Sequence, residues 1–153
     1  MSAAEGQPAP ALDLPTDGGG RVTLAALKGK LAVVYFYPKD DTTGCTREAQ
    51  DFSALAADFA AAGVRVIGVS KDAPAKLGRF AAKHGLTVTL ASDESGAVCE
   101  AFGVWGEKQL YGKTYMGIER ATFLFVDGRL ARSWRKVKVP GHAAAVLEAA
   151  RGA

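Results

Sequence analysis

The sequence predicts an α/β fold in which helices flank a central mixed β-sheet. Two continuous apolar segments, residues 31–37 and 64–69, have the composition of strands that are buried on both faces. Each is followed by a segment whose apolar residues have helical spacing, and this alternation favours parallel strands. A strand–turn–strand pattern and an amphipathic helix end the chain, so antiparallel strands should join the same sheet.

The length and composition favour one folded domain over residues 1–153. Hydrophobic residues make up 48% of the chain and charged residues 23%, a balance that excludes disordered and fibrous classes. The first eight residues lack the basic and apolar regions of a secretory signal. Two cysteines are too few for a disulfide scaffold, so we expect a cytoplasmic protein in a reducing compartment.

A small N-terminal hairpin and a buried strand are the first expected elements. The hairpin should pair residues 11–14 with residues 21–24 around the glycines at 18–20. These glycines do not form a phosphate-binding loop, because a strand pattern rather than a helix follows them. The strand at residues 31–37 comes next and should lie in the centre of the sheet.

One long helix should follow, from Thr43 or Cys45 to Ala62, with Gly63 in the C-cap position. The apolar residues that recur at spacings of three and four are Ala49, Phe52, Ala56 and Phe59. Cys45 lies on the same stripe. Its side chain should therefore face the core while it sits at the open end of the helix, half sheltered from solvent.

The second half of the chain alternates strands and helices and then forms a hairpin. The expected order is strand 64–69, helix 73–84 with Gly85 as its cap, strand 86–91, helix 96–102, strand 121–126, strand 130–137 and helix 141–150. Asp127-Gly128 gives the strongest turn signal in the chain and should join the last two strands.

Basic residues gather near the C-terminus, although the whole chain is only mildly basic, with 19 Lys and Arg against 16 Asp and Glu. The cluster consists of Arg129, Arg132, Arg135, Lys136 and Lys138. They alternate with apolar residues in a strand-like segment, which indicates a solvated edge strand whose charges discourage pairing with other chains. Nucleic-acid binding is the alternative, but no recognised motif or basic helix accompanies these charges.

The most informative segment is the turn between strand 31–37 and the following helix, where Cys45 opens the helix. Free backbone N–H groups and the helix dipole stabilise an anion there, and the thiolate is the nucleophilic form of cysteine. Thr42 is three residues earlier, where its hydroxyl can hold both the sulfur and an incoming oxygen. The N–H groups of Gly44 and Cys45 can donate to a departing oxygen, and Pro38 can screen the thiolate from water.

Cys45 could instead be an ordinary buried cysteine, since free cysteine is among the most buried residue types. The combination of proline, threonine and cysteine at a strand-to-helix turn favours the functional interpretation. Such a site suits the reduction of a peroxide, in which an ionised sulfur attacks one oxygen while donors stabilise the other.

The pattern Pro38-x-x-x-Thr42-x-x-Cys45 resembles the active-site signature of peroxiredoxins. Residues 35–48 and several later segments resemble the PrxQ branch, also called bacterioferritin comigratory protein (BCP). These later segments are 92–93, 102–108, 111–113 and 117–123. The resemblance implies a thioredoxin-like fold and a role in antioxidant defence, through thiol-dependent reduction of hydrogen peroxide and organic hydroperoxides.

Roles for individual residues follow from the same resemblance. Cys45 would be the peroxidatic cysteine, with Thr42 as its hydroxyl partner and Pro38 as its shield. Arg120 would be the cation that stabilises the thiolate and the transition state, and Glu48 would orient it. Considered alone, Arg120 could be a surface arginine and Glu48 a glutamate that suits the helix dipole.

This chain departs from the PrxQ pattern where that branch carries a second cysteine. Some members have it five residues after the peroxidatic one, where this chain has Gln50, and others on the next helix, in the segment matching residues 78–83. A smaller departure is Thr43, where proline is usual. Cys99 is the other thiol, and it is either a small apolar filler or a resolving cysteine reached by local unfolding. We therefore predict a one-cysteine mechanism in which an external thiol reduces the Cys45 sulfenic acid.

The resemblance implies no metal, flavin, haem or nicotinamide cofactor. It implies thioredoxin as the reductant, with glutathione or glutaredoxin as alternatives, and favours a monomer over a dimer. His84 and His142 lack partners at metal-ligand spacing and should be surface or capping residues. Two other functions use the same fold: a peroxide-sensing switch or adaptor, and a thiol–disulfide exchange enzyme. The absence of Cys-x-x-Cys counts against the second.

Overall fold

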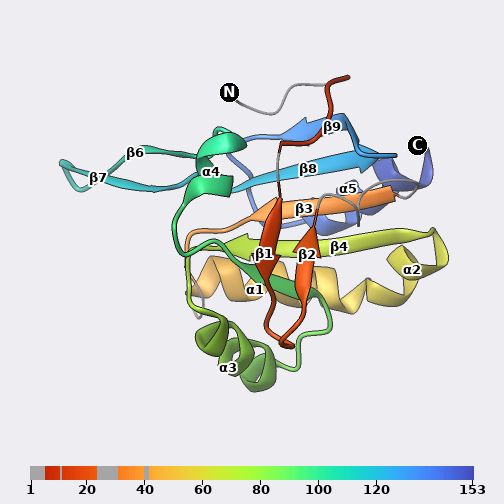
Figure 1. Cartoon of the computed structure of the whole chain (residues 1–153), viewed down its shortest axis with the longest axis horizontal. Coiled ribbons are helices and arrows are strands. Elements are labelled where there is room, and N and C mark those ends of the chain that lie inside the picture. Colours follow the sequence, from red (N-terminus) through yellow and green to blue (C-terminus); the bar gives the residue numbers. More distant parts are fainter. Residues whose placement is uncertain (1–5, 11, 24–30, 40–41) are drawn as a thin grey trace.

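A five-stranded mixed sheet forms the centre of the protein, and smaller elements pack on both of its faces (Figure 1). The structure is a computed structural model that describes residues 6–10, 12–23, 31–39 and 42–153. The strands are β1 (Asp13–Pro15), β2 (Arg21–Thr23), β3 (Leu31–Phe36), β4 (Val64–Ser70), β5 (Thr89–Ser92), β6 (Trp105–Leu110), β7 (Lys113–Ile118), β8 (Ala121–Val126) and β9 (Arg129–Trp134). The helices are α1 (Thr43–Ala54), α2 (Ala56–Ala61), α3 (Pro74–His84), α4 (Ala97–Ala101) and α5 (His142–Arg151).

The strand order β5-β4-β3-β8-β9 confirms the predicted mixed sheet. Strands β5, β4 and β3 are parallel, whereas β8 and β9 are antiparallel to their neighbours. The register pairs Phe36 at the end of β3 with Ala121 at the start of β8. Residues just after β3 and just before β8 are therefore brought to the same edge of the sheet.

Successive residues of β3 point to opposite faces, as expected for a strand. Val34 and Phe36 contribute to the apolar cluster that β1, β2 and α4 cover. Val33 and Tyr35 contribute to the cluster on the other face, which contains residues of α1, α2, α3 and α5. The two clusters are the two cores of the fold, separated by the sheet itself.

The predicted N-terminal hairpin is confirmed for its described part, since β1 pairs antiparallel with β2; Ala11 and Leu24 lie outside the described residues. The predicted helices at 73–84, 96–102 and 141–150 are also present, within one or two residues at each end. Within the described residues, every helix is too short or too polar to cross a membrane.

The single helix predicted up to Ala62 is wrong in one respect, because it is divided at Leu55 into α1 and α2. Next to the break, Ser53 binds a distant segment: its hydroxyl accepts from the N–H of Thr87 at 3.0 Å, and its carbonyl accepts from the Thr87 hydroxyl at 3.4 Å. A tertiary contact thus accompanies the break, and sequence periodicity gives no sign of it.

Two predicted strands have different bounds. The strand expected at 86–91 begins only at Thr89, because the N–H of Leu86 still donates to Ala81 at the end of α3. The strand expected at 130–137 begins at Arg129 and ends at Trp134. Lys136 has a positive φ of 47°, which extended strand backbone does not allow.

The first part of the basic segment forms β9, and the sheet order confirms that this is an edge strand; Arg135, Lys136 and Lys138 follow its end. It is not wholly solvated. Residues 6–9 run beside its start, where the N–H of Gly6 donates to the carbonyl of Leu130 at 2.7 Å. Arg135 donates to the carbonyl of Gly103 at 2.6 Å, so this cation also binds the protein.

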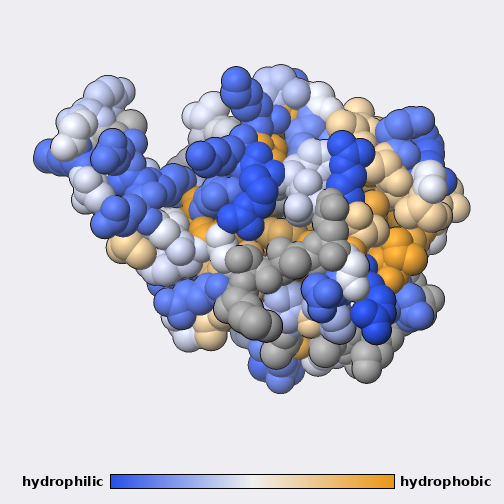
Figure 2. All heavy atoms as spheres, turned by 90° about the horizontal axis from the view of Figure 1, so that it is seen from above, coloured by the Kyte–Doolittle hydropathy of each residue, from blue (hydrophilic) through white to orange (hydrophobic). Residues whose placement is uncertain are grey.

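The hairpin of β6 and β7 was not predicted as a unit. Tyr111 and Gly112 both have positive φ and form its turn. The hairpin projects from the body, and its visible surface is mostly hydrophilic (Figures 1 and 2). Because neither strand has a regularly buried face, the sequence lacks the alternation of apolar residues that identifies a strand.

Candidate active site

Cys45 lies in the first turn of α1, directly after the carboxyl end of β3. Thr42 is the N-cap residue with extended backbone, and its carbonyl accepts from the N–H of Thr46 at 2.8 Å. The Cys45 side chain is only 1% exposed, so the expectation of a half-sheltered thiol is wrong. It belongs to the apolar cluster that also contains Ala49 and Phe52, because all three lie on the buried stripe of α1.

Arg120 joins the Cys45 sulfur to a buried carboxylate. Its Nη2 donates to Cys45 Sγ at 3.3 Å, and its Nη1 donates to Glu48 Oε1 at 2.7 Å. The arginine side chain is 17% exposed and that of Glu48 is 1% exposed. The pairing of β3 with β8 places Arg120 beside α1. The structure thus brings Arg120 to two predicted site residues of α1 that are more than 70 residues away in the sequence.

The electrostatics of this group are those of charges held in a nearly dry pocket. Burial raises the pKa of Glu48 to about 7, against the attraction of Arg120, which lowers it. Burial by itself would lower the pKa of Arg120, but the negative charges and hydrogen bonds of Glu48 and Cys45 outweigh it and raise the pKa. The guanidinium therefore stays charged beside both groups.

Gly44 allows the guanidinium to approach the first turn of α1. A Cβ atom at this position would lie 3.1 Å from Arg120 Nη2, closer than an ordinary van der Waals contact. The guanidinium is fixed by Glu48 on one side and Cys45 on the other, so it has little freedom to withdraw. The absence of a side chain at Gly44 is what this geometry requires.

Thr42 and Pro38 lie at the rim of the site. The Thr42 hydroxyl donates to the carbonyl of Lys39 at 2.9 Å, which closes the turn before α1. Its contact with the sulfur or with an incoming oxygen stays a prediction. Pro38 lines a cleft of about 490 Å³ beside Arg120, and its screening of the thiolate stays a prediction. The other residues that line this cleft are Glu107, Lys108, Gln109, Glu119, Lys136 and Val137.

Several charged residues of the cleft were not predicted as part of the site. Lys108 donates to the carbonyl of Ile118 at 2.8 Å, and burial, followed by the charge of Arg120, lowers its pKa. Glu119 pairs with Arg135 at 2.9 Å and accepts from the N–H of Lys136 at 3.1 Å. The only sequence signal that Glu119 belongs to the site is its position directly before Arg120.

His142 is buried behind the site, so its prediction as a surface or capping residue is wrong. It is 8% exposed, and its Nε2 lies 2.7 Å from the hydroxyl of Thr122 on β8. The rings of Phe52 and Trp134 contact it edge-on. Burial, followed by the charge of Arg120, lowers its pKa to about 4, so it is neutral. Among the described residues, no group of three His, Cys, Asp or Glu side chains could hold a metal ion.

Cys99 lies on the opposite face of the sheet from Cys45. It is 0% exposed and belongs to the cluster of β1, β2 and α4, together with Phe36. Asp93 accepts from its N–H at 2.7 Å, and burial, followed by a hydrogen bond to Asp93, raises the pKa of its thiol above the usual range. Both cysteines are free thiols. The sheet therefore stands between the two sulfurs.

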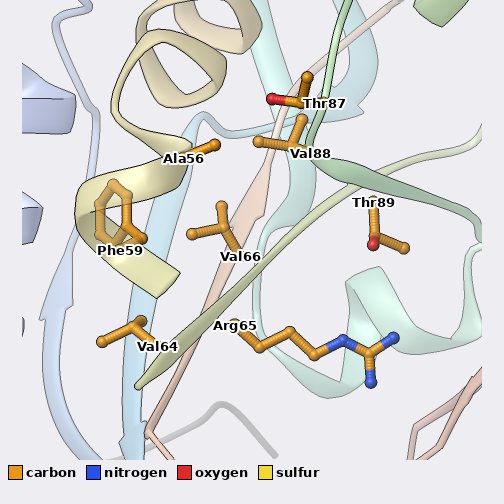
Figure 3. A pocket seen from close by; sticks show the side chains of 8 residues that line it. All are labelled: Ala56, Phe59, Val64, Arg65, Val66, Thr87, Val88 and Thr89. Carbon is orange, nitrogen blue, oxygen red and sulfur yellow. The ribbon is translucent and has the colours of Figure 1, made fainter. Parts of the chain in front are cut away.

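A second cavity, of about 160 Å³, lies at the other end of the sheet (Figure 3). Its lining residues are Ala56, Phe59, Val64, Arg65, Val66, Thr87, Val88 and Thr89. Val64 pairs with Leu31 at the start of β3, whereas Cys45 follows the end of that strand. The cavity contains no nucleophilic thiol and is separate from the Cys45 site.

Comparison with known proteins gives matches over most of the chain. Residues 5–132 match the AhpC/TSA family. The chain is 50% identical to peroxiredoxin Bcp of Xanthomonas campestris over 145 residues, 93% of this chain and 91% of the relative. It is 49% identical to peroxiredoxin Bcp of Bacillus subtilis over 149 residues, 97% and 95% of the two chains.

Two solved structures superpose closely on this chain and have the same fold. A structure of peroxiredoxin Q from X. campestris superposes with a TM-score of 0.90 at 46% identity, covering 99% of this chain and 98% of that one. Another structure, of the X. campestris bacterioferritin comigratory protein, superposes with a TM-score of 0.89 at 46% identity and the same coverage. It is described as a trapped intermediate or ligand complex that gives insight into alkyl peroxide reduction activity.

Proposed function

The chain belongs to the AhpC/TSA family, within its PrxQ or Bcp branch of peroxiredoxins, and on this basis we propose that Cys45 is the nucleophile that attacks the peroxide. The protein is a thiol-dependent peroxidase with a thioredoxin-like fold. The observation that carries the assignment of Cys45 is its contact with Arg120, at 3.3 Å from sulfur to guanidinium. Among the described residues, the hydrogen-bond partner of the Cys99 thiol is the carboxylate of Asp93, and Lys71 acts on it only through its charge.

The proposed reaction uses groups that the fold has already placed. The Cys45 thiolate attacks the terminal oxygen of the peroxide and becomes a sulfenic acid. Arg120 and the N–H groups at the start of α1 stabilise the charge on the departing oxygen. The cleft beside Arg120 has room for the organic part of a hydroperoxide, so we include organic hydroperoxides with hydrogen peroxide as substrates.

An external thiol is the proposed reductant of the Cys45 sulfenic acid. Gln50 replaces a possible second cysteine on α1, α3 contains none, and Cys99 is on the far face of the sheet. A bond between the two sulfurs would require large-scale rearrangement of one core. We propose a thioredoxin-type protein as the thiol donor, with glutathione or glutaredoxin as the alternatives to compare with it.

We further propose that the enzyme acts as a monomer in the cytoplasm. Among the described residues, the large apolar side chains that are exposed are confined to Tyr111, Tyr115 and Met116 of the projecting hairpin and to Val126. Both cysteines are free, as suits a reducing compartment. Size measurement in solution and fractionation of cells test these two points.

Replacement of each cysteine tests the assignment. Cys45→Ser should abolish peroxide consumption, whereas Cys99→Ala should retain it to within about threefold, because Cys99 fills space on the opposite face. Peroxide consumption with a thiol donor is the measurement. Normal turnover by Cys45→Ser contradicts the proposal.

Mass spectrometry after one equivalent of peroxide tests the one-cysteine mechanism. We expect a trapped sulfenic acid at Cys45 as the main product. A Cys45–Cys99 disulfide as the main product contradicts it. Stoichiometric oxidation of Cys45 without turnover by any thiol donor indicates a peroxide-sensing switch instead.

A further inference from the structure

One cation lies between two groups that can each become an anion. Arg120 donates one hydrogen bond to Cys45 Sγ and another to Glu48 Oε1. Both partners are 1% exposed, so neither has water to stabilise its charge. If both were ionised, one buried negative charge would have no counterion, which is costly in a dry pocket. Two anions that share one cation behave as a pair that retains one proton.

The surroundings of Glu48 favour its neutral form. Its Oε2 is buried and has no hydrogen-bond partner among the described residues. A carboxylate with one oxygen unsolvated is strongly disfavoured, whereas a carboxyl group protonated at that oxygen can still accept from Arg120 through the other. Burial raises the pKa of Glu48 to about 7 in spite of the arginine.

Other charges near the pair also assign the proton to Glu48. Asp51, one turn further along α1, carries a negative charge that disfavours ionisation of Glu48. Lys108 on β6 is close enough to interact with Cys45 and Arg120, and Glu119 balances it. His142, from α5, is neutral and supplies no further cation. Among these groups, the charge of Asp51 adds to the burial that disfavours the Glu48 carboxylate.

We propose that Glu48 is the proton reservoir of the peroxide reaction, neutral while Cys45 is a thiolate and ionised once Cys45 is a sulfenic acid. This inference rests on the proposed role of Cys45. Glu48 is a positioning residue, because it acts through Arg120. It holds the guanidinium in place and carries the proton. The thiolate and the Glu48 carboxylate compete for the charge of Arg120. Once Cys45 has become a sulfenic acid, this competition ends and Glu48 can ionise.

The step balances in atoms, electrons and charge. The sulfur supplies an electron pair to the terminal oxygen, the S–O bond forms, and the O–O bond breaks. The other oxygen leaves with the electron pair of that bond and takes the proton that Glu48 gives up, which yields water or an alcohol. Before the step Arg120 is paired with the thiolate, and afterwards it is paired with the Glu48 carboxylate. The buried site holds one anion and one cation throughout.

Proton uptake during oxidation tests this inference. Wild-type protein is mixed with one equivalent of hydrogen peroxide in a weakly buffered indicator solution, and the Cys45 product is quantified by trapping and mass spectrometry. The pKa of about 7 reflects burial, Arg120 and Asp51, and a thiolate at Cys45 that shares Arg120 raises the pKa of Glu48 further. At about pH 8 we therefore expect close to zero protons taken up per Cys45 oxidised, because Glu48 supplies the proton. At about pH 6 we expect close to one, because oxidised enzyme then regains the proton on Glu48. Uptake of one proton at both pH values overturns the inference.

Glu48→Gln is the decisive variant, because glutamine keeps the volume and an acceptor for Arg120 but has no proton to release. It should take up one proton per Cys45 at about pH 8. Zero uptake by this variant means that another group supplies the proton or that the product stays ionised, and it overturns the inference. Asp58→Asn is the control: it neutralises an exposed carboxyl group on α2, outside the site, and should behave as wild type.

The same measurements of proton uptake test the alternative that Glu48 only orients Arg120. In that case Glu48→Gln slows the reaction without changing the number of protons taken up. The proposed function is tested separately by the trapped product. If no sulfenic acid forms at Cys45, the assignment of Cys45 fails. If it forms and wild type takes up one proton at about pH 8, only the role of Glu48 fails.

Discussion

At the scale of single residues, the site depends on a guanidinium that bonds two buried groups at once. The planar fork of arginine supplies two donors in fixed directions, one for Cys45 Sγ and one for Glu48 Oε1. Gly44 leaves the space that this arrangement needs. The contact is therefore sensitive both to the identity of residue 120 and to the size of residue 44.

Arg120 should be required for the peroxide step. Arg120→Ala removes the cation and a donor, and we expect the second-order rate of Cys45 oxidation to fall by about 10²- to 10³-fold. Arg120→Lys keeps the charge but not the two-pronged geometry, so it should fall between alanine and wild type. Single-turnover stopped-flow kinetics measure both. Unchanged rates in Arg120→Ala contradict the role given to this residue.

Gly44→Ala should separate activity from stability. The added Cβ meets Arg120 Nη2 at 3.1 Å, so the guanidinium must shift and Cys45 oxidation should slow by about tenfold, equivalent to about 1.4 kcal/mol in the barrier. Alanine is the better helix former by ~0.5–1 kcal/mol, which limits any loss of stability.

Gly78→Ala is the matched control for this substitution. It also replaces a helical glycine, but the nearest atom to its new Cβ is the Asp17 carbonyl oxygen at an ordinary 3.7 Å. It should stabilise the protein without changing the rate of oxidation. Equal oxidation rates for the two variants contradict the steric argument for Gly44. Stopped-flow kinetics and thermal unfolding are the measurements.

At the scale of elements, α4 shows how a short helix is held in place. With five residues it cannot be stable by itself, and it depends on contacts from outside. The buried Asp93 carboxylate accepts from the N–H groups of Val98 and Cys99, at 3.3 and 2.7 Å. These hydrogen bonds fix Cys99 in the core of its face.

Asp93→Ala should destabilise the fold while leaving the peroxide step intact. It removes a charged acceptor from two buried N–H groups, and we expect the free energy of unfolding to fall by about 2–3 kcal/mol. Ser95→Ala is the control: the Ser95 hydroxyl accepts from the exposed N–H of Ala97 at 3.3 Å, and its loss should cost about 0.5 kcal/mol. Urea unfolding measures both. A loss of Cys45 reactivity in folded Asp93→Ala contradicts the independence of the two faces.

At the scale of the whole molecule, two buried titratable groups should make stability depend on pH in opposite directions. Glu48 has a pKa raised from 4.5 to about 7, so its contribution is complete below about pH 4.5 and is lost as the pH rises through about 7. His142 has a pKa lowered from 6.5 to about 4, so its contribution is complete above about pH 6.5 and is lost as the pH falls through about 4. Between pH 4.5 and 6.5 the two slopes oppose each other.

Substitution of each group should reveal the slope of the other. In a Cys45→Ser background, which removes titration of the thiol, Glu48→Gln should lose the decline of stability on the alkaline side. His142→Gln should lose the decline on the acid side. Urea unfolding over a pH series measures both. If Glu48→Gln keeps the alkaline slope of its parent, the buried carboxyl group is not its source.

The sequence by itself determined the features that depend on neighbours along the chain. The apolar segments predicted β3 and β4, the stripe through Ala49 and Phe52 predicted α1, and Asp127-Gly128 predicted the last hairpin. The turn before Cys45 is also local, since a strand end, a proline and a helix start occur within a few residues. Local backbone preferences and periodicity carry this information, so these predictions succeeded.

Only the tertiary structure decided which distant groups meet. The register of β3 with β8 places Arg120 against Cys45, and burial between them raises the pKa of Glu48. The helix α4 packs on the opposite face of the sheet from α1, and this separates Cys99 from Cys45, which no count of cysteines reveals. His142 was misjudged for the same reason, because its partner Thr122 is on another element. Burial and charge at a site come from packing across the sheet, whereas a sequence pattern records only order along the chain.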